Sequence, residues 1–208
     1  MRAFNRDKTP PLDPEVQNSI SNFTVSQRFK TLNLEIGCGV GLHPILWAKD
    51  NPEHGLIALE RTKEKFIKFS HRMQHHSHIK NVLPLHADAR SVVTHQLADE
   101  SIETIFLLYP NPEPKNKNQR WINMPFFSEF TRILKPHGQI EIRTNILAYA
   151  EEVKTLSASR GFTIHKYDSI SSTNKPETHF EKKYLARNQI CMKIVLKLSQ
   201  NTNSYLHL

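Results

Sequence analysis

The chain has 208 residues, of which 38% are hydrophobic, and 28 lysines and arginines against 20 aspartates and glutamates give a formal net charge of +8. This length predicts one domain with a sizeable core, and no apolar run approaches the roughly 18–20 residues that a membrane span needs. The N-terminus lacks the apolar segment of a signal peptide, and Cys38 and Cys191 form neither a disulfide framework nor a zinc pattern. We therefore expect a soluble, cytoplasmic protein, and its positive charge favours a polyanionic partner such as nucleic acid.

The first 31 residues are expected to form an arm that packs on, or trails from, the main domain. One short helix is predicted over residues 14–23, because Val16, Ile20 and Phe23 lie on one side of it. Prolines between residues 10 and 14 interrupt regular structure before this helix.

Residues 32–42 form the clearest pattern in the chain. Leucine and isoleucine alternate with polar residues up to Ile36, which is typical of a β-strand. Three glycines follow at once, namely Gly37, Gly39 and Gly41. Glycines here let the backbone turn sharply and let a ligand approach it closely. Pro44 indicates a helix start and predicts a helix over residues 43–50, which completes the first unit of a nucleotide-binding α/β sheet.

Strands and helices then alternate along the chain. Further strands are predicted at residues 55–60, 81–86, 101–108, 139–144, 163–167 and 191–198. Helices are predicted at residues 62–73, 124–134 and 147–160, and around Val92, Val93 and Leu97. The polar basic segment 115–121 and the serine-rich segment 168–178 are expected to be loops, the second of them mobile. This alternation predicts a doubly wound α/β sheet.

Polar side chains follow the predicted strands, where an open α/β sheet binds its ligands. They are Glu35 before the glycines, Glu60, Asp88, Asn111 and the pair Thr144 and Asn145. Any one of them alone is more often a helix cap or a solvated loop residue. Their succession over several strands favours a binding site, and Glu60, 19 residues after Gly41, ends the strand where a ribose diol would be held.

The glycine spacing distinguishes between cofactors. A dinucleotide-binding enzyme needs its third glycine where Leu42 stands, so that the pyrophosphate can reach the helix N-terminus. Glycines two residues apart, with Glu35 in the preceding strand, fit a ligand without phosphates instead. This pattern points to S-adenosylmethionine, whose ammonium group Glu35 could attract directly or through water.

The chain resembles the bacterial tRNA (guanine-N7)-methyltransferases, a family of class I S-adenosylmethionine-dependent methyltransferases, over most of residues 32–196. The motifs that carry the resemblance are Leu34-Glu-Ile-Gly, Leu59-Glu60, Asp88-Ala89, Tyr109-Pro-Asn-Pro112, residues 132–138, Thr144-Asn145 and Thr178-His-Phe-Glu181. The resemblance implies a Rossmann-like class I methyltransferase domain at residues 32–198, mostly parallel with an antiparallel last strand. An N-terminal arm (1–31) precedes it, and a C-terminal tail (199–208) follows it.

The resemblance also implies the ligands and the residues that bind them. S-adenosyl-L-methionine would be the cofactor and tRNA the substrate, with no membrane or metal partner, and the protein would be a monomer or a homodimer. The residues implied for the cofactor are Glu35, Gly37, Gly39, Gly41, Glu60, Arg61, Asp88, Ala89 and Asn111, the last also catalytic. The residues implied for the substrate are Lys115, Asn145, Thr178, Phe180 and Glu181.

Basic and aromatic residues flank this expected site and suit RNA phosphates and unstacked bases. The basic residues are Arg61, Lys63, Lys65, Lys115, Lys117, Arg120, Lys182, Lys183 and Arg187, and the aromatic ones are Trp121, Phe180 and Tyr184. The histidines between residues 71 and 78 have no nearby acids in the sequence to support metal binding and are interpreted as a surface cluster.

The chain departs from the family at five points. Asn111 and Asn145 replace aspartates, Glu113 replaces a tryptophan, and Asn188 stands where a glycine is expected, while the N-terminal Gly-Arg segment has no counterpart. Asn111-Pro112 is also typical of enzymes that methylate exocyclic amines. Methylation of an exocyclic amino group or a small amine, and a non-catalytic RNA-binding paralogue, therefore stay open as alternatives.

Overall fold

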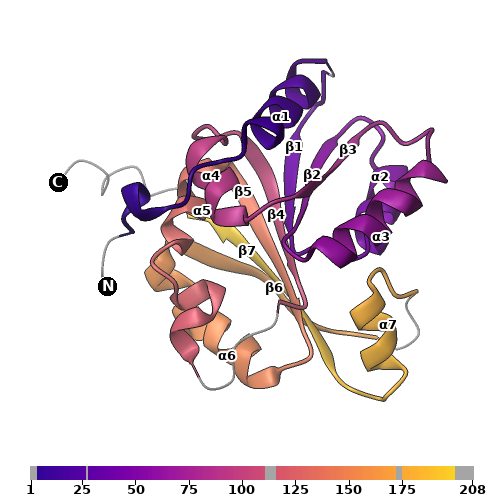
Figure 1. Ribbon diagram of the computed structural model, residues 1–208. Coiled ribbons are helices and arrows are strands. Elements are labelled where there is room, and N and C mark those ends of the chain that lie inside the picture. The colour runs from indigo at the N-terminus through magenta and orange to yellow at the C-terminus, as the bar shows by residue number, and fades with distance from the viewer. Residues whose placement is uncertain (1–3, 27, 111–115, 172–174, 200–208) are drawn as a thin grey trace.

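The computed structural model describes residues 4–26, 28–110, 116–171 and 175–199. A seven-stranded sheet forms the centre of the molecule, and helices pack on both of its faces (Figure 1). In chain order the strands are β1 (Leu32–Ile36), β2 (Gly55–Glu60), β3 (Val82–His86), β4 (Ile102–Leu108), β5 (Leu134–Thr144), β6 (Phe162–Ile170) and β7 (Cys191–Leu198). The α-helices are α1 (Pro14–Ser26), α2 (Leu42–Asp50), α3 (Lys63–Gln74), α4 (Ala89–His95), α5 (Phe127–Ile133), α6 (Leu147–Leu156) and α7 (His179–Leu185). Short 3-10 helices occupy Arg6–Lys8, Lys117–Gln119, Trp121–Asn123 and Ala158–Arg160.

The strand order is β3-β2-β1-β4-β5-β7-β6. The first five strands pair in parallel, whereas β7 runs antiparallel to both β5 and β6. This confirms the predicted mostly parallel, doubly wound sheet. The strand order reverses between β1 and β4, so the carboxyl ends of these two strands border the crevice where such sheets bind ligands.

The two faces of the sheet are covered unequally. The larger core packs α1, α4, α5 and α6 on one face and includes Ile20, Phe130 and Tyr149, all at most 2% exposed. The smaller core packs α2 and α3 against the other face around Phe69 and Phe106. In Figure 1 these helix groups lie on opposite sides of the strands.

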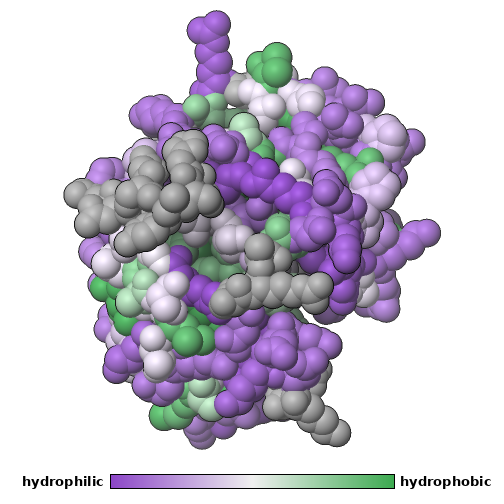
Figure 2. Space-filling model, turned by 90° about the vertical axis from the view of Figure 1, so that its left-hand side faces the viewer, coloured by the Kyte–Doolittle hydropathy of each residue, from purple (hydrophilic) through white to green (hydrophobic). Residues whose placement is uncertain are grey.

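The face on the α2 side carries polar residues where β4, β5 and β7 run beside one another. Gln139, Glu141 and Arg143 alternate along β5 with Ile140 and Ile142, which belong to the larger core. This alternation leaves a polar strip of sheet beside the apolar contacts of α2 and α3. The opposite side of the molecule, seen in Figure 2, is mainly hydrophilic, with hydrophobic residues in separate patches.

Most predicted elements are present, and β2 and β7 have their predicted bounds. The arm contributes to the core, because Ile20 and Phe23 of α1 are buried. The boundaries that divide arm, domain and tail stay a prediction, and the tail beyond Ser199 lies outside the described residues. In the described part of the chain, no helix is long and apolar enough to cross a membrane.

The prediction of a loop over residues 168–178 was wrong at its start. Strand β6 continues to Ile170, because Asp168 and Ile170 pair with Lys193 and Cys191 of β7. At the other end Thr178 caps α7, a helix that was not predicted, by accepting a hydrogen bond from the Glu181 amide at 2.9 Å. Residues 172–174 lie outside the described residues.

The helix predicted over residues 124–134 is shorter in the structure, where α5 spans Phe127–Ile133. Residues 135–138 end it as predicted, but they already belong to β5, whose pairing with β4 shifts register between Ile102 and Thr104. The helix predicted over residues 147–160 ends as α-helix at Leu156 and continues as a short 3-10 turn before Gly161.

Candidate functional site

The loop between β1 and α2 takes a conformation that favours glycine at three positions. Gly37, Gly39 and Gly41 have φ angles of 77°, 62° and 81°, a region that other residues adopt only with strain. A Cβ added at Gly37 or Gly39 would meet nothing within 4 Å, so these two glycines face open space. A Cβ at Gly41 would lie 1.9 Å from the ring of Phe69, so this glycine lets α3 pack against the loop.

The glycine loop and the start of α7 border one cavity of about 230 Å³. Residues from four parts of the chain line it, namely Glu35, residues 37–40, Leu42, His43, Lys65, Leu108 and residues 178–180. Thr178 and Phe180 therefore reach the loop that Glu35 precedes, although about 140 residues separate them. Phe180 is 40% exposed, and its ring stacks on Tyr184 with centroids 6.1 Å apart and planes 21° apart.

Glu60, at the carboxyl end of β2, is bonded to the glycine loop. Its Oε2 accepts a hydrogen bond from the Gly39 amide at 2.9 Å, and its Oε1 accepts one from the Thr62 amide at 2.7 Å. The residue is 6% exposed. Because each carboxylate oxygen can accept a second hydrogen bond, Glu60 keeps acceptor capacity for a hydroxyl beside the loop.

Glu35 and His43 form a buried pair behind the same loop. The Nδ1 atom of His43 lies 2.7 Å from Oε2 of Glu35, and the two residues are 5% and 2% exposed. Cys38 lies next to this pair. Burial raises the pKa of its thiol well above 9.0, and the carboxylates of Glu35 and Glu60 raise it further, so Cys38 is a protonated thiol at neutral pH.

Asp88 and Ala89 lie where β3 ends and α4 begins. Asp88 caps α4 by accepting from the Arg90 amide at 2.8 Å and also pairs with the Arg90 guanidinium. Burial alone would raise the pKa of Asp88, but the bonds from Arg90 outweigh it and lower the pKa. The Ala87 amide donates to the Glu60 carbonyl at 3.2 Å, which brings the ends of β2 and β3 together.

Two further predicted residues, Arg61 and Asn145, lie outside the small cavity. Arg61 is exposed, and its carbonyl oxygen lies 3.1 Å from His86 Nε2. Asn145, after β5, donates to the Gln189 side chain at 3.0 Å and does not line the small cavity. Asn111 and Lys115 lie outside the described residues.

Glu181 is enclosed rather than exposed to a substrate. It is 1% exposed, and its carboxylate accepts from Arg143 Nη1 at 3.2 Å, from the Tyr109 hydroxyl at 3.1 Å and from the Glu177 amide at 2.7 Å. These bonds join α7 to the ends of β4 and β5. In this conformation Glu181 holds the segment that carries Thr178 and Phe180 to the cavity.

Sequence reasoning missed His43 and Arg143. Arg143 left a signal in the sequence, because a strand that alternates Gln139, Glu141 and Arg143 with isoleucines predicts one polar face. His43 left no comparable signal, since its partner Glu35 lies on another element and only the turn at the glycines brings the two side chains together.

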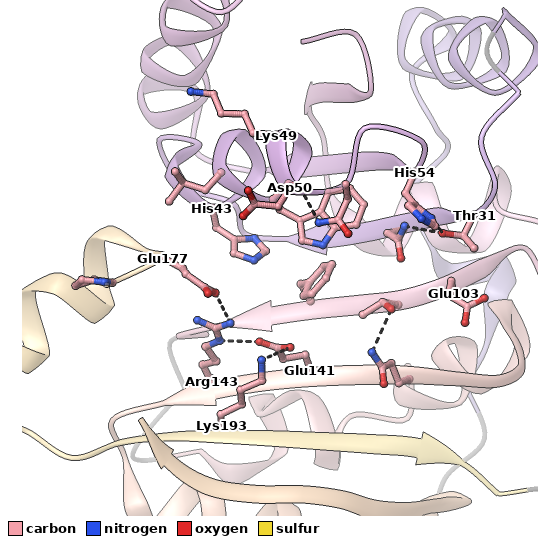
Figure 3. Close-up of a pocket in the computed structure, with 18 of the residues that line it drawn as sticks. Thr31, His43, Lys49, Asp50, His54, Glu103, Glu141, Arg143, Glu177 and Lys193 are labelled. Carbon is pink, nitrogen blue, oxygen red and sulfur yellow. Dashed lines mark hydrogen bonds and ion pairs between the residues drawn. The ribbon is translucent and has the colours of Figure 1, made fainter. Parts of the chain in front are cut away.

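A second, larger cavity of about 810 Å³ opens over the polar strip of the sheet. Figure 3 shows Arg143, Glu141 and Lys193 directed into it from β5 and β7, with His43 extending toward them from α2. Glu141 accepts from Arg143 at 2.6 Å and pairs with Lys193 at 2.9 Å. His43 lines both cavities and therefore lies between them. In the described residues, no group of three histidine, cysteine or acidic side chains is arranged to hold a metal ion.

The fold and the glycine loop agree with a family whose model matches most of the chain. Residues 30–194 match the model of the family described as "Putative methyltransferase", and the chain therefore belongs to that family. The relatives include proteins named "tRNA (guanine-N(7)-)-methyltransferase". That of Bartonella henselae is 32% identical over 67% of this chain and 62% of its own length, and that of Francisella philomiragia is 29% identical over 80% and 75%. The resemblance predicted from the motifs is thus confirmed.

The match covers only part of some relatives. It spans 62% of the Bartonella protein and 38% of a Campylobacter jejuni relative that is 29% identical. Among solved structures, "Structure of an antibiotic related Methyltransferase" has a TM-score of 0.70 at 16% identity, covering 94% of this chain and 99% of that one. The 16S rRNA methyltransferase KamB has a TM-score of 0.66 at 16% identity, covering 96% and 100%. These two likenesses show the fold.

Proposed function

We propose that this protein transfers the methyl group of S-adenosylmethionine to N7 of a guanine in tRNA. The observation that supports the proposal is the cavity lined by Glu35 and the glycine loop on one side and by Thr178 and Phe180 on the other. The named relatives support the same substrate. The cytoplasm is the compartment we propose, since a tRNA-modifying protein acts there.

The residues around the loop fit this cofactor. Gly37 and Gly39 leave open space beside the backbone, Glu60 has acceptor capacity for ribose hydroxyls, and Glu35 is a carboxylate for the ammonium group. S-adenosylmethionine, when bound, supplies an electrophilic methyl group on a sulfonium. The protein's part is to hold the cofactor so that this methyl faces the mouth of the cavity.

Guanine N7 needs no general base, because it offers an in-plane lone pair and carries no proton. The protein has to align N7 with the methyl group and tolerate the positive charge that develops on the purine. Phe180 is the aromatic residue at the cavity that can stack on the base, and Tyr184 supports its ring. Asn111 and Asn145 offer carbonyl dipoles where the family has aspartates, so we expect weaker charge stabilisation than in the family.

A basic surface around the cavity suits the tRNA backbone. Arg72 of α3 lies 2.7 Å from His179 of α7, so these two helices adjoin. Both expose lysines, with Lys65 on α3 and Lys182 and Lys183 on α7. Phosphates of an RNA whose base enters the cavity would meet these side chains.

The test is the transfer of labelled methyl groups from S-adenosylmethionine to unmodified tRNA. We expect label in the tRNA with the native protein. Glu60→Gln should weaken cofactor binding roughly 10- to 100-fold, since a hydrogen bond to a charged group is worth roughly 1.5–3 kcal/mol. Glu53→Gln, which alters an exposed glutamate paired with Lys30, is the matched control and should leave binding unchanged.

Two results would replace this proposal. Cofactor binding without any transfer to tRNA would favour the non-catalytic RNA-binding paralogue. Transfer to an exocyclic amine would favour the alternative that Asn111-Pro112 suggests. Tight binding of a nicotinamide dinucleotide would contradict the interpretation of the glycine loop.

A further inference from the structure

The buried pair of Glu35 and His43 has a geometry that ordinary burial of an acid does not require. Glu35 is the penultimate residue of β1, and His43 lies in the first turn of α2, on the far side of the glycine loop. Nδ1 of His43 and Oε2 of Glu35 lie 2.7 Å apart, within hydrogen-bond distance, and an ionised carboxylate at Glu35 would accept this bond from the imidazole. The bond therefore spans the base of the loop that we assign to the cofactor.

The imidazole is fixed from a second direction. Its ring lies edge-on to Phe106 of β4, with centroids 5.0 Å apart and planes 62° apart. His43 is 5% exposed and forms part of the wall between the two cavities, where Figure 3 shows its ring extending from α2 toward the sheet. With the ring held on both sides, the direction of the Glu35 carboxylate is held as well.

We propose that His43 is a positioning residue that orients Glu35 toward the amino-acid end of the cofactor. This inference rests on the proposed use of S-adenosylmethionine. If Glu60 holds the ribose at the end of β2, the amino-acid end lies toward β1 and α2, where Glu35 and His43 line the cavity. A charge-assisted hydrogen bond that keeps Oε2 in place leaves Oε1 for the ammonium group.

The inference makes His43 a determinant of ligand preference. S-adenosylhomocysteine carries the amino-acid group, whereas 5′-methylthioadenosine keeps the adenosine and lacks that group. A carboxylate oriented by His43 should favour the first ligand over the second. If His43 only provided a hydrogen-bond partner for a buried acid, its loss would lower the affinity for both ligands equally, through a general change in the cavity.

Calorimetric binding of both ligands separates these two cases. In His43→Ala, affinity for S-adenosylhomocysteine should fall about tenfold, in keeping with one charge-assisted hydrogen bond, while affinity for 5′-methylthioadenosine stays within about twofold. His43→Asn places an amide nitrogen near the position of Nδ1 and should restore most of the preference. His54→Gln is the control, because His54 lines the larger cavity but bonds to Thr31.

The coupling between the two residues gives a second arm. In a Glu35→Gln background, His43→Ala should have no further effect on the ratio of the two affinities. The inference would be overturned if His43→Ala lowered the affinity for both ligands equally. It would also be overturned if His43→Ala changed the ratio of the two affinities as much in the Glu35→Gln background as in the native protein. If the native protein bound neither ligand, both the proposed function and this inference would fail. If it bound both ligands without any preference, only this inference would be overturned.

Discussion

At the scale of single residues, the glycines of the β1–α2 loop divide two tasks between them. Gly39 and Gly41 both have a positive φ angle, but Gly39 faces open space, whereas Gly41 lies against the ring of Phe69. The first is thus available to a ligand, and the second is needed for packing. This difference leads to opposite expectations for the same substitution.

Gly39→Ala should impair cofactor binding more than folding. Its cost in stability is the backbone strain of about 1–2 kcal/mol, while the added methyl enters the space beside the loop. Gly41→Ala should mainly impair folding, because overpacking against Phe69 adds about 1–3 kcal/mol to the same strain. Urea unfolding and cofactor titration of both variants test this, and equal stability losses would contradict it.

At the scale of elements, ion pairs hold α7 against the sheet. Arg143 of β5 bonds to Glu181 of α7, to Glu177 just before that helix and to Glu141 on its own strand. Seven residues form a marginal helix by themselves. The position of Thr178 and Phe180 at the cavity therefore depends on these tertiary contacts.

Glu141 makes this part of the protein sensitive to acid. Burial alone would raise the pKa of Glu141 above its ordinary value of 4.5, but Arg143 and Lys193 outweigh burial and lower it. A carboxylate with a lowered pKa in the folded state stabilises the protein above its ordinary pKa, and this contribution is lost as the pH falls below that value.

Glu141→Gln should therefore lower the free energy of unfolding at pH 7 by about 2 kcal/mol. The difference in free energy of unfolding between the native protein and the variant should become smaller as the pH falls below 4.5. Urea unfolding at neutral and acidic pH measures it. If this difference in free energy of unfolding were the same at every pH, the charge of Glu141 would not contribute to stability.

Elements with a clear local pattern could be predicted from the sequence, whereas contacts between distant residues could not. Strands β2 and β7 are apolar along most of their length, and their bounds followed from that pattern. Helix α7 has a local start signal that the prediction did not use, because Thr178 and Glu181 follow the capping-box pattern. Its place against the sheet depends on Arg143, 38 positions away from Glu181, which no local pattern indicates. Asn188 takes a left-handed φ of 55° after α7, a conformation that suits the glycine expected there from the resemblance and that asparagine also adopts.

At the scale of the whole molecule, the fold places the glycine loop, Glu60 and the start of α7 at one edge of the sheet, with basic residues around them. The glycine loop, Glu35 and Glu60 were predictable because strand ends meet at one edge. The His43–Glu35 and Arg143–Glu181 pairs were not, because each joins elements that only the folded chain brings together.

The basic surface predicts a steep salt dependence of tRNA binding. If several lysines and arginines neutralise phosphates, affinity should fall at least tenfold between about 50 and 200 mM salt. Exchanging Lys182 and Lys183 for glutamine should lower the slope of log affinity against log salt by about 2. A salt response that is flat, or that is unchanged in this variant, would contradict an RNA surface at α7.

Mass spectrometry of nucleosides is the direct test of methyl transfer to guanine N7. Unmodified tRNA is incubated with the protein and S-adenosylmethionine, digested and compared with tRNA incubated without protein. We expect 7-methylguanosine as the new nucleoside, and none with Glu60→Ala. A methyl group on an exocyclic amine, or no new methylated nucleoside from a protein that binds the cofactor, would contradict it.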